Sequence, residues 1–285
     1  MSDMKICVTG ANGYIGSHVV DYLVGREFDV VAVDFNKNNI NSGAAFINAN
    51  IFEYSDANSL YNLLQKPTHI IHLAWRNGFE HNNFSHIEDL KLHAKFFFDM
   101  VNCGVKSFSC MGSMHEIGYY EGCVDENTQC NPMSLYGISK NALRAILLNS
   151  VCTSKHETSV KWLRAYYIMG CDARNNSIFS KISKMEKEGK DKFPFTDGTS
   201  MFDFIQVTDL AKQIALSSIQ NEVDGIIEVC SGKPRMIKDL VERYIKDNNY
   251  KIKPQYGMFK PRAYDSKIIY GNTTKIKMIL DAVNE

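Results

Sequence analysis

Near its amino terminus the chain reads Lys5-Ile6-Cys7-Val8-Thr9-Gly10-Ala11-Asn12-Gly13-Tyr14-Ile15-Gly16, an apolar run followed by three spaced glycines. Glycines at this spacing permit a tight turn and let a ligand approach the backbone closely. Apolar residues then recur at Ile15, Val19 and Leu23, which is the spacing of a helix. The amino end of such a helix offers N–H groups and a positive dipole end to phosphate. We therefore predict a strand, turn and helix that bind the pyrophosphate of a dinucleotide.

An acidic residue follows at the position where a dinucleotide site needs one. Asp34 ends a second apolar strand, 18 residues after Gly16. A carboxylate at this place accepts hydrogen bonds from both hydroxyls of the adenine ribose. The same charge repels a 2′-phosphate, so we expect NAD rather than NADP as the cofactor.

Strands and helices alternate through the first half of the chain. Strands are expected at residues 5–9, 30–34, 45–48, 69–73, 107–111 and 160–164. This alternation predicts an α/β fold, a Rossmann-type doubly wound parallel sheet. We place an NAD-binding domain at residues 1–165 and a smaller, interleaved substrate-binding region at residues 166–285. In that region helices are expected near 177–188, 207–219 and 236–247, and the polar stretch 189–200 is expected to be a surface loop.

Composition argues against several other classes of protein. The 285 residues contain 32 lysines and arginines against 32 aspartates and glutamates. The chain therefore lacks the net positive charge that would favour binding to nucleic acid or to an anionic membrane. The amino terminus lacks the pattern of a signal peptide, and no apolar run approaches the roughly 20 residues of a membrane span. We expect a cytoplasmic enzyme without nucleic-acid or membrane partners.

The eight cysteines give no sign of a metal site. No C-x-x-C pair occurs, and the spacing of Cys103, Cys110, Cys123 and Cys130 does not match a zinc site. We expect reduced thiols and no metal.

A second motif lies mid-chain and reads Tyr136-Gly137-Ile138-Ser139-Lys140. Residues four apart share one face of a helix, so the phenol and the ammonium are expected side by side. A free tyrosine has a pKa near ~10, and the neighbouring cation is expected to lower that pKa. Tyr136 then serves as proton donor or acceptor for a carbonyl or alcohol. Ser113, just past a strand, is placed to bind the same substrate oxygen.

In this order along the chain the motifs resemble the extended short-chain dehydrogenase/reductase family, and within it the nucleotide-sugar epimerases, dehydratases and ketoreductases. The matching segments are Val8–Gly16, Ile70–Ala74, Gly112-Ser113, Tyr136–Lys140 and Asp203–Ala211. The resemblance covers nearly the whole chain. It implies a nucleotide-diphosphate sugar as substrate and a homodimer as the assembly.

The resemblance also assigns residues to roles. Ser113, Tyr136 and Lys140 are the expected catalytic residues. The cofactor contacts implied are Gly10, Asn12, Gly13, Tyr14, Ile15, Gly16, Asp34, Asn50, Ile51, Leu73, Ala74, Trp75, Tyr136, Lys140 and Tyr166. The substrate contacts implied are His115, Tyr167, Asn176 and Arg262, with Arg262 matching a late diphosphate-binding arginine.

Departures from the family pattern narrow the reaction. Members that dehydrate a sugar carry an aspartate and a glutamate where this sequence has Met114 and His115. Dehydration is therefore disfavoured, because no carboxylic acid would protonate the departing hydroxyl. The GDP-fucose synthases place a histidine just after the glycine that matches Gly170, and Cys171 follows here.

Two reactions remain, and both need the same serine, tyrosine and lysine. One is reduction of the 4-keto group of a nucleotide-linked 6-deoxyhexose; the other is 4-epimerisation of a nucleotide sugar. Tyr167 and Phe202 stand where epimerases carry an asparagine and an arginine that contact the sugar nucleotide, which favours the reductase. The segment 113–120 also resembles that of reductases making dTDP-6-deoxy-talose or dTDP-fucose. A non-catalytic NAD-binding regulator is a third alternative, disfavoured by the intact catalytic residues.

Overall fold

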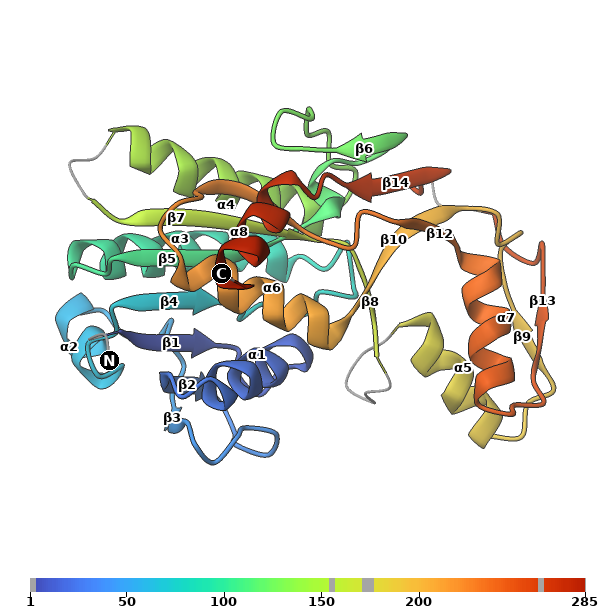
Figure 1. The fold of residues 1–285 in the computed structure, drawn as a ribbon, viewed down its shortest axis with the longest axis horizontal. Coiled ribbons are helices and arrows are strands. Elements are labelled where there is room, and N and C mark those ends of the chain that lie inside the picture. Colours follow the sequence, from blue (N-terminus) through green and yellow to red (C-terminus); the bar gives the residue numbers. More distant parts are fainter. Residues whose placement is uncertain (1–3, 154–156, 171–176, 261–263, 285) are drawn as a thin grey trace.

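The computed structural model describes residues 4–153, 157–170, 177–260 and 264–284, and its centre is a seven-stranded parallel sheet (Figure 1). The strand order is β11-β7-β5-β4-β1-β2-β3. The strands are β1 (Lys5–Thr9), β2 (Asp29–Asp34), β3 (Ala45–Asn48), β4 (His69–His72), β5 (Ser107–Ser113), β7 (Ser159–Ala165) and β11 (Gly225–Val229). The order reverses between β1 and β4, which is where ligands bind at the carboxyl ends of such sheets. The predicted Rossmann-type fold is confirmed.

Helices cover both faces of this sheet, so its strands are buried on two sides. On one face lie α1 (Tyr14–Gly25), α6 (Val207–Ile219) and α8 (Thr274–Asn284); on the other lie α2 (Ala57–Leu63), α3 (Ser85–Asn102) and α4 (Leu135–Thr153). Strand β1 shows the alternation directly. Ile6 and Val8 pack against the first group of helices, whereas Cys7 packs against the second.

The glycines of the first turn are required by close contacts with other backbone atoms. Gly10 has a φ of +69°, and a Cβ there would lie 2.7 Å from the nitrogen of Ala74. A Cβ on Gly16 would lie 2.1 Å from the carbonyl oxygen of Gly10. No side chain fits in either place, so the turn packs directly on α1 and on the end of β4.

The second lobe is built around a smaller sheet in the order β12-β10-β14-β6, with β8 also paired to β10. Its strands are β6 (Gly122–Val124), β8 (Tyr167–Met169), β10 (Met201–Gln206), β12 (Pro234–Met236) and β14 (Ile268–Gly271). Helices α5 (Ile178–Lys187) and α7 (Ile237–Asp247) and the strand pair β9 (Lys192–Pro194) and β13 (Lys253–Gln255) complete it (Figure 1). Strand β11 comes from the same later part of the chain but pairs with β7 in the large sheet.

One sequence-based expectation about this lobe was wrong. The stretch 189–200 is not only a surface loop, because it contains β9, and Phe193 and Phe195 are buried in the core of the second lobe. The alternation of these two phenylalanines was hidden by the lysines, aspartates and glycines around it. The division of the chain at residues 165 and 166 stays a prediction.

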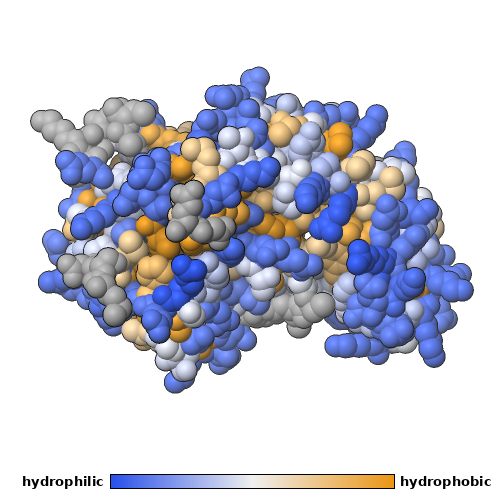
Figure 2. All heavy atoms as spheres, viewed as in Figure 1, coloured by the Kyte–Doolittle hydropathy of each residue, from blue (hydrophilic) through white to orange (hydrophobic). Residues whose placement is uncertain are grey.

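Figure 2 shows a mainly hydrophilic face with apolar residues gathered towards its middle. None of the helices in the described ranges is long and apolar enough to cross a membrane. Within the described part of the chain the free thiols are Cys7, Cys103, Cys110, Cys123, Cys130 and Cys230. No cluster of His, Cys, Asp or Glu suited to a metal occurs among the described residues.

The packing of Gly16 gives a first test. Gly16→Ala is expected to abolish NAD binding and to cost about 1–3 kcal/mol of stability, because its Cβ overlaps the Gly10 carbonyl. Gly25→Ala is the matched control in the same helix, since no atom lies within 4 Å of a Cβ built there. Thermal unfolding and NAD titration measure both variants. Wild-type NAD affinity in Gly16→Ala would contradict the role given to this contact.

Candidate functional site

The glycine turn and Asp34 meet at the carboxyl ends of β1 and β2. Asp34 Oδ2 accepts a hydrogen bond from the backbone nitrogen of Asn12 at 2.9 Å, and Oδ1 accepts one from Phe35 at 2.7 Å. A carboxylate has about four lone-pair sites, so capacity for two further donors remains. Gly13 has no side chain to cap α1, and no acidic residue lies in the first turn. This arrangement suits an anionic ligand with a ribose beside it.

The other predicted cofactor residues lie along the same edge. Asn50 follows β3, and its amide bonds the Glu53 carboxylate at 2.9 Å, while Ile51 beside it is buried. Leu73 and Ala74 continue β4 and pack against the glycine turn, as the contact between Gly10 and Ala74 shows.

Strand β5 and helix α4 bring Ser113 and Tyr136 together. Ser113 lies close enough to the Tyr136 phenol to lower the pKa of that phenol, and the Ser113 hydroxyl accepts a bond from the backbone nitrogen of His115 at 3.3 Å. The first turn of α4 is held from outside the helix, because the Tyr136 backbone nitrogen donates to the His81 carbonyl at 2.8 Å. The two side chains are therefore neighbours, and their joint catalytic role stays a prediction.

Lys140 lies one turn further along α4, but its ammonium has other partners. Its Nζ donates to the Met111 carbonyl at 2.7 Å and lies 3.7 Å from the centroid of the Trp75 ring. The distance from Nζ to the Tyr136 ring centroid is 5.9 Å. A cation over an indole face is attracted by the ring quadrupole, so Trp75 helps to fix the ammonium.

The expected lowering of the tyrosine pKa does not occur within the protein. Burial raises the pKa of Tyr136 to about 12, and the Ser113 hydrogen bond opposes this only in part. Burial also lowers the pKa of Lys140 to about 8, against the opposing charges of Cys110 and Glu116. The sequence argument considered charge alone, whereas desolvation is the larger effect here.

Two residues that the sequence did not single out complete the wall beside the phenol. The His81 ring stacks on the Tyr136 ring with centroids 5.5 Å apart, and its Nδ1 lies 3.3 Å from the Tyr264 hydroxyl. The His115 ring lies 4.3 Å from that of His81. His81 and Tyr264 are 183 residues apart in the chain and lie in loops, so no local pattern could have found the pair.

A third unforeseen residue, Glu116, lies beneath Ser113. The short 3₁₀ turn η1 (Met114–Glu116) begins at Ser113 with a reciprocal capping box, in which Glu116 Oε1 accepts a bond from the Ser113 nitrogen at 2.6 Å. The pattern Ser-x-x-Glu is readable in a sequence, so this contact could have been predicted.

The structure places two of the four remaining predicted cofactor and substrate residues. The Tyr166 hydroxyl donates to Glu228 at 2.8 Å, and its side chain is buried in the core of the second lobe. Tyr167 stacks on Phe202 with ring centroids 4.5 Å apart. Asn176 and Arg262 lie outside the described residues.

Comparison with known proteins agrees with this geometry. Residues 6–230 match the family described as the NAD dependent epimerase/dehydratase family. The chain belongs to the NAD-dependent epimerase/dehydratase family. NAD is the cofactor of this family, as the sequence predicted.

Two curated proteins illustrate the range of this family. The chain is 41% identical to the dTDP-6-deoxy-L-talose 4-dehydrogenase (NAD(+)) of Aggregatibacter actinomycetemcomitans, over 94% of this chain and 99% of that protein. It is 30% identical to a putative UDP-glucose 4-epimerase of Methanocaldococcus jannaschii, over 83% of this chain and 80% of that protein.

Solved structures of low sequence identity share the fold. MoeE5 in complex with UDP-glucuronic acid and NAD has a TM-score of 0.82 at 22% identity, covering 97% of this chain and 92% of its own. UDP-glucose 4-epimerase of Thermotoga maritima has a TM-score of 0.81 at 23% identity, covering 96% and 92%.

Asp34 gives a test of cofactor selectivity. Asp34→Ala is expected to lower the preference for NADH over NADPH by roughly 10–100-fold, because charge-assisted hydrogen bonds to the ribose are lost together with the repulsion of a 2′-phosphate. Asp29→Asn, at the other end of β2 and 57% exposed at its side chain, is the control. The ratio of kcat/KM for the two cofactors measures the effect. An unchanged ratio would remove Asp34 from this role.

A chain of buried histidines gives a test by pH. His72 lies between Thr9 and His93, with contacts of 2.7 Å and 2.8 Å, and His93 stacks on Trp75 at 4.3 Å. Burial, assisted by the Lys140 charge, lowers the pKa of His72 to about 3. The unfolded state binds a proton near pH ~6.5 and the folded state does not until about pH 3, so stability falls as pH drops through this window.

We expect acidification from pH 7 to 5 to remove about 2 kcal/mol through this side chain. Urea unfolding of the wild type and of His72→Gln at both pH values measures the difference. The variant should lose less stability on acidification than the wild type does. Equal losses in the two proteins would show that His72 does not carry the effect.

Proposed function

We propose that this protein reduces the 4-keto group of a nucleotide-linked 6-deoxyhexose with NADH, and that the reaction is reversible. The observation that carries the proposal is the proximity of Ser113 to the Tyr136 phenol at the carboxyl end of β5. We expect both hydroxyls to bind one carbonyl oxygen. NADH supplies the hydride, and the Tyr136 phenol supplies the proton.

The state of the phenol supports reduction. A pKa of about 12 keeps Tyr136 protonated at neutral pH, which is the form that donates to a carbonyl oxygen. The nicotinamide ring of NADH is uncharged, so it adds no cation that would remove this proton. The Lys140 ammonium, which lies over the Trp75 ring, is a positive charge nearby that stabilises the phenolate as it forms.

The surroundings of Ser113 support reduction over dehydration. The Met114 side chain is buried, and the Glu116 carboxylate is fully buried and occupied by the Ser113 nitrogen, Trp162 and Arg164. Neither residue can act as the acid that expels a hydroxyl. His81, His115 and Tyr264 instead offer hydrogen-bonding groups beside the phenol, which suit the hydroxyls of a sugar.

The proposal extends to the residues that contact the substrate and to the assembly of the protein. We assign His115 and Tyr167 to the sugar, and Asn176 and Arg262 to the nucleotide. The relative from Aggregatibacter, by its name, acts at carbon 4 of a dTDP-linked 6-deoxyhexose. We further propose that the protein is cytoplasmic. We also propose a homodimer formed through α3 and α4, because the apolar residues Phe98 and Ile138 on these helices are 42% and 43% exposed.

A second candidate is 4-epimerisation of a nucleotide sugar. The relative from Methanocaldococcus supports it, and epimerisation uses the same serine, tyrosine and lysine. The two reactions differ in cofactor balance, because an epimerase returns its hydride to the substrate whereas a reductase consumes NADH.

We expect the wild-type protein to oxidise NADH stoichiometrically with a dTDP-4-keto-6-deoxyhexose, followed by absorbance and by product analysis. Interconversion of two 4-epimers without net NADH consumption would support the epimerase instead. If neither reaction is observed, the result supports a non-catalytic NAD-binding regulator.

Tyr136→Phe tests the proton donor. The change should lower kcat by about 10²–10⁴-fold, the usual contribution of general acid catalysis, while NAD binding is largely kept. Tyr119→Phe is the control, since Tyr119 is 49% exposed and its hydroxyl bonds Glu121. Full activity of Tyr136→Phe in the NADH assay would contradict the mechanism.

A further inference from the structure

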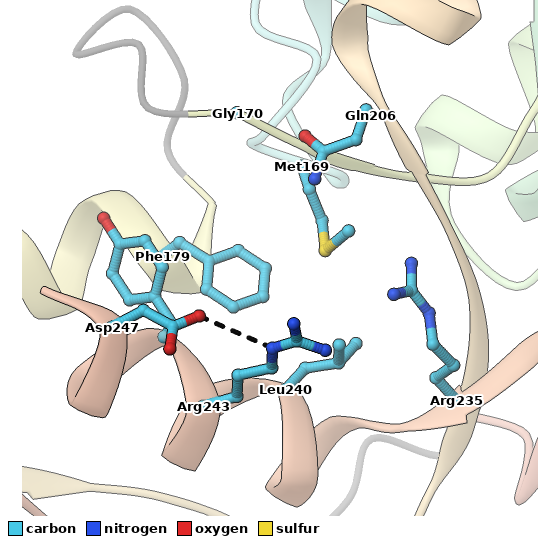
Figure 3. A pocket seen from close by; sticks show the side chains of 9 residues that line it. Met169, Gly170, Phe179, Gln206, Arg235, Leu240, Arg243 and Asp247 are labelled. Atoms are coloured by element: carbon cyan, nitrogen blue, oxygen red, sulfur yellow. Dashed lines mark ion pairs between the residues drawn. The ribbon is translucent and has the colours of Figure 1, made fainter.

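The second lobe contains a cavity of about 360 Å³ between α5, α7 and the ends of β8, β10 and β12 (Figure 3). This volume lies within the range of sites that bind small ligands. Its apolar side chains include Phe179, Leu240 and Met169, and its polar groups include Arg235, Arg243 and Gln206. A ligand that fits here needs an apolar part and an anionic part.

The two arginines of the cavity differ in their partners. Arg243 on α7 is paired with Asp247 at 3.4 Å, and the two side chains are 78% and 61% exposed (Figure 3). Arg235 on β12 donates from Nη2 to the Phe204 carbonyl at 2.9 Å and makes no ion pair with any described residue. Arg235 is therefore the cation of this cavity whose charge is not neutralised by a described carboxylate.

Arg235 also has a buried donor that lacks an acceptor. Its Nε is removed from solvent and has no hydrogen-bond partner within the described part of the chain. A buried N–H without an acceptor is costly, and native proteins leave few of them. The Nε atom has no exposed surface and is not reached from the cavity, so the feature that suits an anionic ligand oxygen is the charge of the guanidinium that lines the cavity.

The position of Arg235 in the sheet places it beside the expected path of the substrate. In the register of β10 and β12, Arg235 is the direct partner of Phe202, so their side chains lie on one face of the sheet. Phe202 stacks on Tyr167, the residue that we assign to the sugar. Arg235 thus places a positive charge beside Phe202, a side chain that has no charge of its own.

The backbone connects this cavity to the catalytic residues. Ser113 pairs with Ala165 at the end of β7, and the chain continues through β8 to Gly170, which lines the cavity. Five residues of extended chain span at most about 18 Å. The catalytic residues and the cavity are therefore joined by one short segment of chain.

We propose that Arg235 binds the diphosphate of the nucleotide sugar and sets the affinity for the nucleotide end of the substrate. The inference rests on the proposed function for the identity of the ligand. Arg235 has this role in addition to the one predicted for Arg262, and it acts on binding and not on hydride transfer.

Calorimetric titration with dTDP, UDP and GDP tests this directly. At least one diphosphate should bind the wild type, and Arg235→Met should weaken that binding by about tenfold or more, as expected for loss of charged hydrogen bonds. Arg243→Met, in the same cavity but exposed and paired, should change it by less than about threefold. In the NADH assay Arg235→Met should raise the KM for the keto sugar and leave kcat within about twofold.

Arg235→Gln, which keeps an N–H donor but removes the charge, is measured in parallel in case the methionine variant folds poorly, and NAD binding reports whether each variant is folded. Wild-type diphosphate affinity in a folded Arg235 variant overturns the inference, as does an equal loss in Arg243→Met or a wild type that binds none of the three. Diphosphate binding that depends on Arg235 without any NADH oxidation contradicts only the proposed function. NADH oxidation with an unchanged KM in an Arg235 variant contradicts only this inference.

Discussion

A buried carboxylate holds the edge of the sheet at which the catalytic serine lies. Glu116 is fully buried and accepts hydrogen bonds from the Trp162 indole at 2.9 Å, from Arg164 at 3.3 Å and from the Ser113 nitrogen at 2.6 Å. Because a buried charge that loses its partner costs about 3–5 kcal/mol, these groups are held together. The position of Ser113 is thus fixed by the interior of the protein, and its side chain lies beside the phenol of Tyr136.

The same network extends across the sheet and into the second lobe. Arg164 bonds Glu228 on β11 at 2.6 Å, and Glu228 in turn accepts the Tyr166 hydroxyl. Burial raises the pKa of Glu228 to about 7, and the Arg164 charge opposes that rise. Tyr166 directly precedes β8, so the ion network sets where the chain leaves the large sheet. The catalytic edge and the proposed nucleotide cavity are therefore positioned by one set of buried charges.

The sequence could predict the elements that repeat a simple pattern. Six strands of the large sheet and the glycine turn follow from local periodicity and motif order, and helix 207–219 matches α6 in full. Strand β9 was missed because it is three residues long and Phe193 is its only large apolar residue. His81 was missed because its contact with Tyr136 depends on how a loop folds back on α4. The direction of the Tyr136 pKa was wrong because burial cannot be read from the spacing of two residues.

Burial acts on both ionisable groups of the site by disfavouring their charged forms. It lowers the pKa of Lys140 to about 8 and raises the pKa of Tyr136 to about 12. His72 and His93 stay uncharged because burial lowers their pKa values, and this leaves Lys140 as the cation over Trp75. The buried histidines therefore matter to the chemistry because they are uncharged, since an imidazolium stacked on Trp75 would repel the ammonium that lies over the same ring.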